Sequence, residues 1–194
     1  MDLSSHTSVK LSTSLVLLAL VFMGFPSYEL HAQSPLNYNI PRVNTEPRID
    51  GQIDQGEWSQ ATRIPVNIET NPNDNVPAEV EAQALLMEDG EVLYVAFIAL
   101  DPDPDQIRAF YRDRDSMWND DWVAIVLDTF NDERRAFEFF ANPYGVQADA
   151  IQDDVNGDED RSWNAIWDSA GQINQDGYVV EMAIPMKQLR FTPS

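Results

Sequence analysis

Two neighbouring segments, residues 122–130 and 135–142, are rich in β-branched and aromatic residues and have four polar residues between them. This pattern predicts two β-strands joined by a tight turn, because such side chains fit a pleated surface better than a helix. Every position in residues 122–127 is apolar, so both faces of the first strand are apolar. A strand of this kind is expected in the middle of a packed sheet rather than at its edge.

Further segments of the same kind lie before and after this pair at short intervals. The other expected strands cover residues 62–69, 79–87, 91–100, 146–151, 165–173 and 178–184. Glu88-Asp89-Gly90 and Asp176-Gly177 are typical hairpin turns, and residues 54–58 suit a single helical turn. Short strands between such turns predict an all-β fold, an antiparallel, jelly-roll-like β-sandwich. Because no strand pattern closes the sequence, the sandwich is expected to be truncated, without its closing strands.

The first 32 residues have the pattern of a secretory signal peptide. Lys10 precedes an apolar run over residues 15–25, and Leu30-His31-Ala32 is a small-residue cleavage pattern. The run is short for a membrane span, so we expect cleavage near Ala32, with an uncleaved anchor as the alternative. Residues 33–47 then form an extended lead-in, and residues 48–194 form the domain. The protein is expected to be exported, to the periplasm, the outer membrane or the extracellular space.

Charge and composition exclude several functions. The 194 residues carry a net charge of −21, which repels nucleic-acid phosphates and anionic lipid headgroups. The chain has no cysteine, and both histidines, His6 and His31, lie in the leader. Ser-His-Asp and Cys-His catalysis are therefore excluded from the processed chain, and neither zinc nor haem is expected. Composition does not exclude the pair of catalytic carboxylates that a glycosidase uses, but no segment of the sequence indicates where such a pair would lie.

An indole and several carboxylates crowd the start of the first strand. An indole ring covers the apolar C–H face of a sugar, while carboxylates and amides form hydrogen bonds with its hydroxyl groups. The predicted ligand-binding residues are Trp118, Asp120, Asp121 and Asn142. The alternative is that Trp118 only caps the sandwich. Trp163 and Trp167 are expected to pack in the core, with a second sugar platform as the alternative.

Aspartates that alternate with proline offer a second type of site. Asp101, Asp103 and Asp105 present hard oxygen ligands for calcium in a rigid loop, and Asp149 is a further possible ligand. The acidic segment 153–160 lacks the glycine that an EF-hand loop has at its sixth position. The alternative is that these acidic loops are only solvated.

Five segments, in their order along the chain, resemble the family 9 carbohydrate-binding module. They are Ile49-Asp50-Gly51 with Asp54 and Trp58, residues 93–97, Asp120-Asp121 before residues 123–128, Asn142-Pro143 with Gly145, and residues 178–181 with Ile184-Pro185. The resemblance covers residues 42–191. It implies a β-sandwich that binds sugars on aromatic residues and carries structural calcium.

The resemblance implies a non-catalytic carbohydrate-binding domain that supports carbohydrate catabolism, with an oligo- or polysaccharide as its partner. In sugar-binding members two tryptophans clamp the ligand. Trp118 matches the first, and the second lies in closing strands that this chain lacks. Phe140 replaces a sugar-binding arginine, whereas Asn142 is kept.

The ending Leu189-Arg190-Phe191 resembles a subset of the family in which the module precedes an outer-membrane β-barrel. A C-terminal β-barrel or a linked catalytic domain, such as a glycoside hydrolase, is therefore expected in the full-length protein. The alternative function is a periplasmic plug, docking or interaction domain that binds no sugar.

Overall fold

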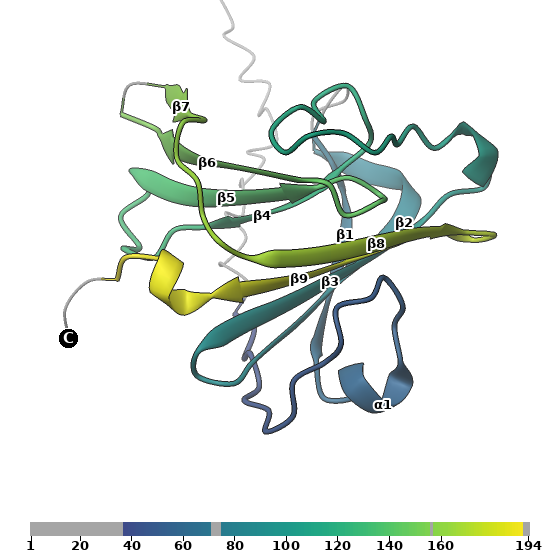
Figure 1. Cartoon of the computed structure of the whole chain (residues 1–194), viewed down its shortest axis with the longest axis horizontal. Helices are drawn as coiled ribbons and strands as arrows, with labels where there is room; N and C mark the ends of the chain where they lie inside the picture. The colour runs from purple at the N-terminus through teal and green to yellow at the C-terminus, as the bar shows by residue number, and fades with distance from the viewer. Residues whose placement is uncertain (1–36, 71–74, 156, 192–194) are drawn as a thin grey trace, which may run out of the picture. The chain divides into compact units, whose positions relative to one another are not determined.

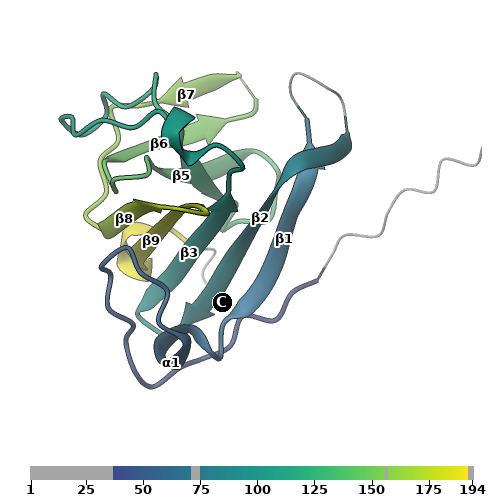
Figure 2. The same cartoon turned by 90° about the vertical axis from the view of Figure 1, so that its right-hand side faces the viewer.

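The computed structural model describes residues 37–70, 75–155 and 157–191. In these residues two antiparallel sheets pack face to face (Figures 1 and 2), which confirms the predicted β-sandwich. The signal peptide and the start of the lead-in lie outside the described residues, so the domain boundaries stay predictions. The elements are α1 (Gln55–Trp58), β1 (Thr62–Glu69), β2 (Val76–Glu88), β3 (Val92–Leu100), η1 (Pro104–Gln106), β4 (Val123–Leu127), β5 (Arg135–Ala141), β6 (Gln147–Asp153), β7 (Asp158–Asp160), β8 (Asp168–Asn174), β9 (Gly177–Pro185) and η2 (Met186–Gln188).

The first sheet has the strand order β1-β2-β3-β9-β8, and the second has the order β4-β5-β6-β7. Most neighbours in a sheet are also consecutive in the chain, and the exception is the pairing of β3 with β9. The β2–β3 hairpin turns as predicted at Asp89 and Gly90. The Asp89 carboxylate accepts hydrogen bonds of 2.8 Å from the backbone N–H groups of Glu91 and Val92, which closes this turn.

Strand β4 lies at an edge of the second sheet, so the prediction of a central position was wrong. In the described residues β4 pairs with β5 alone. Its inward side chains, such as Ile125, pack against the core between the sheets. On the other face Ala124 packs beneath the loop of residues 107–121, while Val126 is 53% exposed. The apolar outer positions therefore reflect a loop that covers part of this face.

Several element boundaries differ from the prediction: β8, for example, begins at Asp168 rather than at residue 165. Two of the differences have a clear local cause. The first strand of the hairpin ends at Leu127, since the Asp128 carboxylate accepts hydrogen bonds from four backbone N–H groups of residues 130–133. These hydrogen bonds, led by the one from Glu133, lower the pKa of Asp128. The acidic segment 153–160, expected to be a loop, includes the short strand β7, which pairs with β6.

The main core lies between the two sheets and includes Val95, Phe139 and Met182. Trp167 is buried there, with its ring perpendicular to that of Phe139 at 5.4 Å. Trp163 packs against the same phenylalanine from a partly buried position. Both tryptophans therefore pack in the core, as expected.

A second apolar cluster covers the opposite face of the first sheet, where residues 37–58 pack. Trp58 is 1% exposed and lies among side chains such as Leu85 and Tyr94. The buried carboxylate of Glu181 accepts hydrogen bonds from Trp58 Nε1 at 2.8 Å and from the backbone N–H of Gly51 at 2.7 Å. Burial raises the pKa of Glu181, and these donors oppose the shift. Trp58 is thus structural.

Candidate functional site

The predicted ligand-binding residues gather around the outer face of the second sheet. Phe140 on β5 points to this face, because the neighbouring Phe139 points into the core. The loop of residues 107–121 folds over the face and buries Met117 completely. Trp118 lies half-buried beside the same cluster. The site is therefore a sheet face that is framed by one loop.

Asp120 and Asn142 lie together, but both are buried. The Asn142 amide donates to Asp120 Oδ2 at 2.9 Å and to the carbonyl oxygen of Phe110 at 3.0 Å. Its carbonyl oxygen accepts from the backbone N–H groups of Tyr144 and Val146. Asn142 therefore uses both amide hydrogens and its oxygen within the protein.

Asp120 also forms hydrogen bonds within the loop of residues 107–121. Its carboxylate accepts from the Phe110 N–H at 3.1 Å and from Arg112 Nε at 3.3 Å. Asp120 is 6% exposed and Asn142 is fully buried. Asp121, in contrast, is exposed and accepts from the Arg108 N–H at 2.8 Å. The structure thus gives these residues a role in fixing the loop, and their contact with a sugar stays a prediction.

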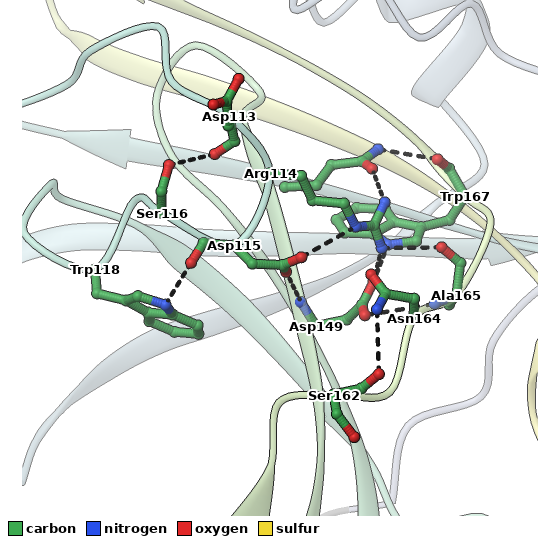
Figure 3. Close-up of polar contacts among 11 residues, drawn as sticks. Asp113, Arg114, Asp115, Ser116, Trp118, Asp149, Ser162, Asn164, Ala165 and Trp167 are labelled. Atoms are coloured by element: carbon green, nitrogen blue, oxygen red, sulfur yellow. Dashed lines mark hydrogen bonds and ion pairs between the residues drawn. The ribbon is translucent and has the colours of Figure 1, made fainter.

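Trp118 is held by a hydrogen bond within its own loop and by an aromatic contact with β5. Its Nε1 donates to the Asp115 carbonyl oxygen at 2.9 Å (Figure 3). Its ring makes a T-shaped contact with Phe140 at 5.2 Å. The guanidinium of Arg161 lies 4.2 Å from the ring centroid, and the same group pairs with Glu159. One face of the indole therefore carries a cation.

Trp122 contributes a second indole to the same face, although the sequence placed it only in a strand. Its ring makes a T-shaped contact with Phe140 at 5.2 Å and an angle of 84°, and the residue is 44% exposed. Phe140 therefore contacts both Trp118 and Trp122. At the position where the resemblance implies a sugar-binding arginine, this chain has Phe140, whose ring contacts both indoles.

The four predicted metal ligands do not form one site. The described residues contain no group of three or more His, Cys, Asp or Glu side chains arranged to hold a metal ion. The Asp101 carboxylate accepts from the Asp103 N–H at 2.7 Å, and Asp105 is exposed in η1. Calcium binding by the loop of residues 101–105 therefore stays a prediction, and no group of three possible ligands in the described residues supports it.

Asp149 has a different environment, shown in Figure 3. Its buried carboxylate accepts a 2.8 Å hydrogen bond from Trp167 Nε1 and pairs with Arg114, which also donates to the carbonyl oxygen of Ala165. The partners present are N–H donors, whereas a calcium ion requires oxygen ligands. These residues therefore do not fit a calcium ion at Asp149. Instead, Asp149 connects β6 to the segments that carry Arg114 and Trp167.

Glu138, on the outer face of β5, is a buried carboxyl group that the sequence did not single out. It is 6% exposed, and among the residues that the structure describes its Oε2 finds no hydrogen-bond partner. Burial, together with the adjacent carboxyl of Glu159, raises the pKa of Glu138 to about 7. Asp154 raises this pKa further, and Arg161 opposes the shift.

We expect Glu138 to make the fold less stable as pH rises from about 4.5 to about 7. The native state keeps its proton in this window while the unfolded chain loses it, so stability falls with rising pH by up to about 3 kcal/mol. Urea unfolding across pH 4–9 would measure the slope. Glu138→Gln should remove this part of the slope and stabilise the protein at pH 8; equal pH profiles for both proteins would contradict the assignment.

The described residues include no helix that is long and apolar enough to cross a membrane.

Two packed antiparallel sheets define the fold class, a β-sandwich. The chain belongs to the carbohydrate family 9 binding domain-like family, whose model matches residues 49–194. This membership confirms the resemblance seen in the sequence and the predicted class, a carbohydrate-binding domain.

One curated relative is endo-1,4-beta-xylanase C from Paenibacillus barcinonensis, which is 26% identical over 149 residues. The match covers 74% of this chain but only 12% of the xylanase, so this chain is similar to a small part of that relative.

Solved structures support the fold. A Bacteroides uniformis protein, provisionally described as carbohydrate-binding, has a TM-score of 0.59 at 14% identity over 77% of this chain and 72% of its own. A family 9 module from Caldicellulosiruptor kristjanssonii in complex with cellotriose has a TM-score of 0.52 at 20% identity, over 75% of this chain and 66% of its own. The glucose complex from the same organism has a TM-score of 0.51 at 20% identity, over 80% and 70%.

Proposed function

We propose that this chain is the non-catalytic carbohydrate-binding domain of an exported protein and that it binds an oligo- or polysaccharide on the outer face of the second sheet. The observation that carries the proposal is the pair of partly exposed indoles, Trp118 and Trp122, that both contact the buried ring of Phe140 on the outer face of this sheet. Aromatic rings bind the C–H faces of sugars, and no catalytic group is needed for this role.

The relatives support a choice of ligand class. The Caldicellulosiruptor kristjanssonii structures hold cellotriose and glucose, and the curated relative is a xylanase. We therefore propose a saccharide of the gluco- or xylo-configuration as the ligand of this chain. Export is supported by the signal-peptide pattern of residues 1–32, and a linked β-barrel or catalytic domain stays an expectation.

Arg161 affects how a sugar can reach Trp118. Its guanidinium covers one face of the indole at 4.2 Å and is held by Glu159. A cation over an aromatic ring at an exposed site contributes about 0.5–1 kcal/mol. A sugar that stacks on this face must displace Arg161, so part of the stacking energy is offset and we expect modest affinity for single sugars.

Trp118→Ala should weaken oligosaccharide binding about five-fold or more, because stacking on an aromatic face contributes about 1 kcal/mol beyond area burial. Isothermal titration with cello- and xylo-oligosaccharides measures the loss, and tryptophan fluorescence reports ligand contact. Trp122→Ala should weaken binding in the same direction.

Circular dichroism of each variant controls for folding. An intact wild-type domain that responds to none of these sugars would contradict the proposal and favour the plug or docking alternative. Unchanged affinity in both tryptophan variants would move the sugar site away from this face.

A further inference from the structure

A pair of stacked tyrosines forms an aromatic contact distinct from those of Trp118 and Trp122 with Phe140. The rings of Tyr111 and Tyr144 have centroids 4.6 Å apart and are nearly parallel, with an interplanar angle of 10°. Tyr111 is 81% exposed, so the ring face turned away from Tyr144 is open to solvent. An aromatic ring with this exposure contributes little to the core, and its open face is available to a ligand.

The protein holds both tyrosines in place through its backbone. Phe110, the residue before Tyr111, has its N–H bonded to Asp120 and its carbonyl oxygen bonded to Asn142. Arg112, the residue after it, donates to the Asp120 carboxylate. The same Asn142 accepts the N–H of Tyr144 at 3.0 Å. One buried network therefore positions the two rings, and pre-organised groups lose less entropy when a ligand binds.

The surroundings favour a sugar over a protein partner. Phe110, the residue before Tyr111, is 54% exposed. The Arg112 guanidinium lies 4.9 Å from the centre of the Phe110 ring. Arginine supplies several N–H donors, which suit the hydroxyl oxygens of a sugar. Three rings make a much smaller patch than the roughly 800 Å² per partner of a stable protein interface, but they match one or two pyranose rings.

We propose that Tyr111, backed by Tyr144, is a second sugar-stacking platform, separate from the Trp118 and Trp122 face, which binds another part of the same polysaccharide chain. The inference rests on the proposed function. Two platforms on one domain raise the affinity for a long polymer, because binding at the second platform is intramolecular. A short oligosaccharide that occupies the Trp118 face gains nothing from Tyr111.

The test compares a polymer with a short ligand. Tyr111→Ala should weaken binding to insoluble cellulose or xylan about five-fold or more, measured by depletion of the protein from solution. It should leave the affinity for a trisaccharide within about two-fold of the wild type. Tyr111→Phe keeps the ring and should retain most of the binding to the polymer. Gln106→Ala, an exposed residue in η1, is the control variant.

The outcomes separate the two proposals. If the wild type binds sugar and Tyr111→Ala binds both polymers as tightly as the wild type does, the second platform is wrong and the proposed function stands. Equal losses on the polymer and the trisaccharide would also overturn it, because Tyr111 would then belong to the first site. If the wild type binds no sugar, the proposed function fails and the platform fails with it.

Discussion

Trp58→Ala is expected to destabilise the domain by about 3–5 kcal/mol, because it opens a cavity in a well-packed cluster. Trp58 is 1% exposed and packs against side chains such as Leu85 and Met87. The substitution also removes the indole N–H that bonds the buried Glu181 carboxylate. Urea unfolding measures the free energy of unfolding, and we expect the melting temperature to fall by about 10 °C or more.

Trp122→Ala is the matched control, since it removes the same side chain from a position that is 44% exposed. This control should change the free energy of unfolding by about 1 kcal/mol or less. Equal destabilisation by the two substitutions would show that the cluster around Trp58 is not the second core that the structure describes.

Asn142→Ala should cost about 3 kcal/mol or more, because it leaves several buried groups without partners. The amide bonds Asp120, the Phe110 carbonyl oxygen and two backbone N–H groups of the turn that follows β5. The loop of residues 107–121 should loosen as a result. Hydrogen exchange of its amides, together with urea unfolding, would measure both effects.

Asn119→Ala provides a control at an exposed asparagine in the same loop. Asn142→Asp is more informative, because it places a second buried carboxylate beside Asp120. This variant should be at least as unstable at neutral pH and should recover part of its stability in acid. Loop amides that exchange as slowly in Asn142→Ala as in the wild type would contradict the role of the network.

The strands could be predicted because alternation of apolar residues is a local property. Strand β1 begins and ends where the pattern predicted, and the β2–β3 hairpin turns at Gly90 as expected. The edge position of β4 could not be predicted, since it depends on which distant segment covers each face. The three acidic residues of β7 carry no strand pattern, and only their pairing with β6 identifies them.

The candidate site was predictable in part for the same reason. Sequence reasoning grouped Asp120 with Asn142, and the structure brings them to 2.9 Å, but their burial depends on a loop whose path is not local. Arg161 on the Trp118 ring and Tyr144 behind Tyr111 are contacts between distant segments. Adjacent exposed aromatics, Phe110 and Tyr111, were the available signal for the second platform.

The Glu181 carboxylate also bears on how the chain folds. Its hydrogen-bond donors, at Asp50, Gly51 and Trp58, lie 123 to 131 residues earlier in the sequence. Closing so long a loop costs entropy before any contact offsets it, and such non-local contacts slow folding. During synthesis Trp58 emerges long before β9, so its cluster at first lacks both the Glu181 carboxylate and the strand that pairs with β3. The N-terminal segment is therefore expected to be among the last parts to dock, in a single late step that requires almost the whole domain.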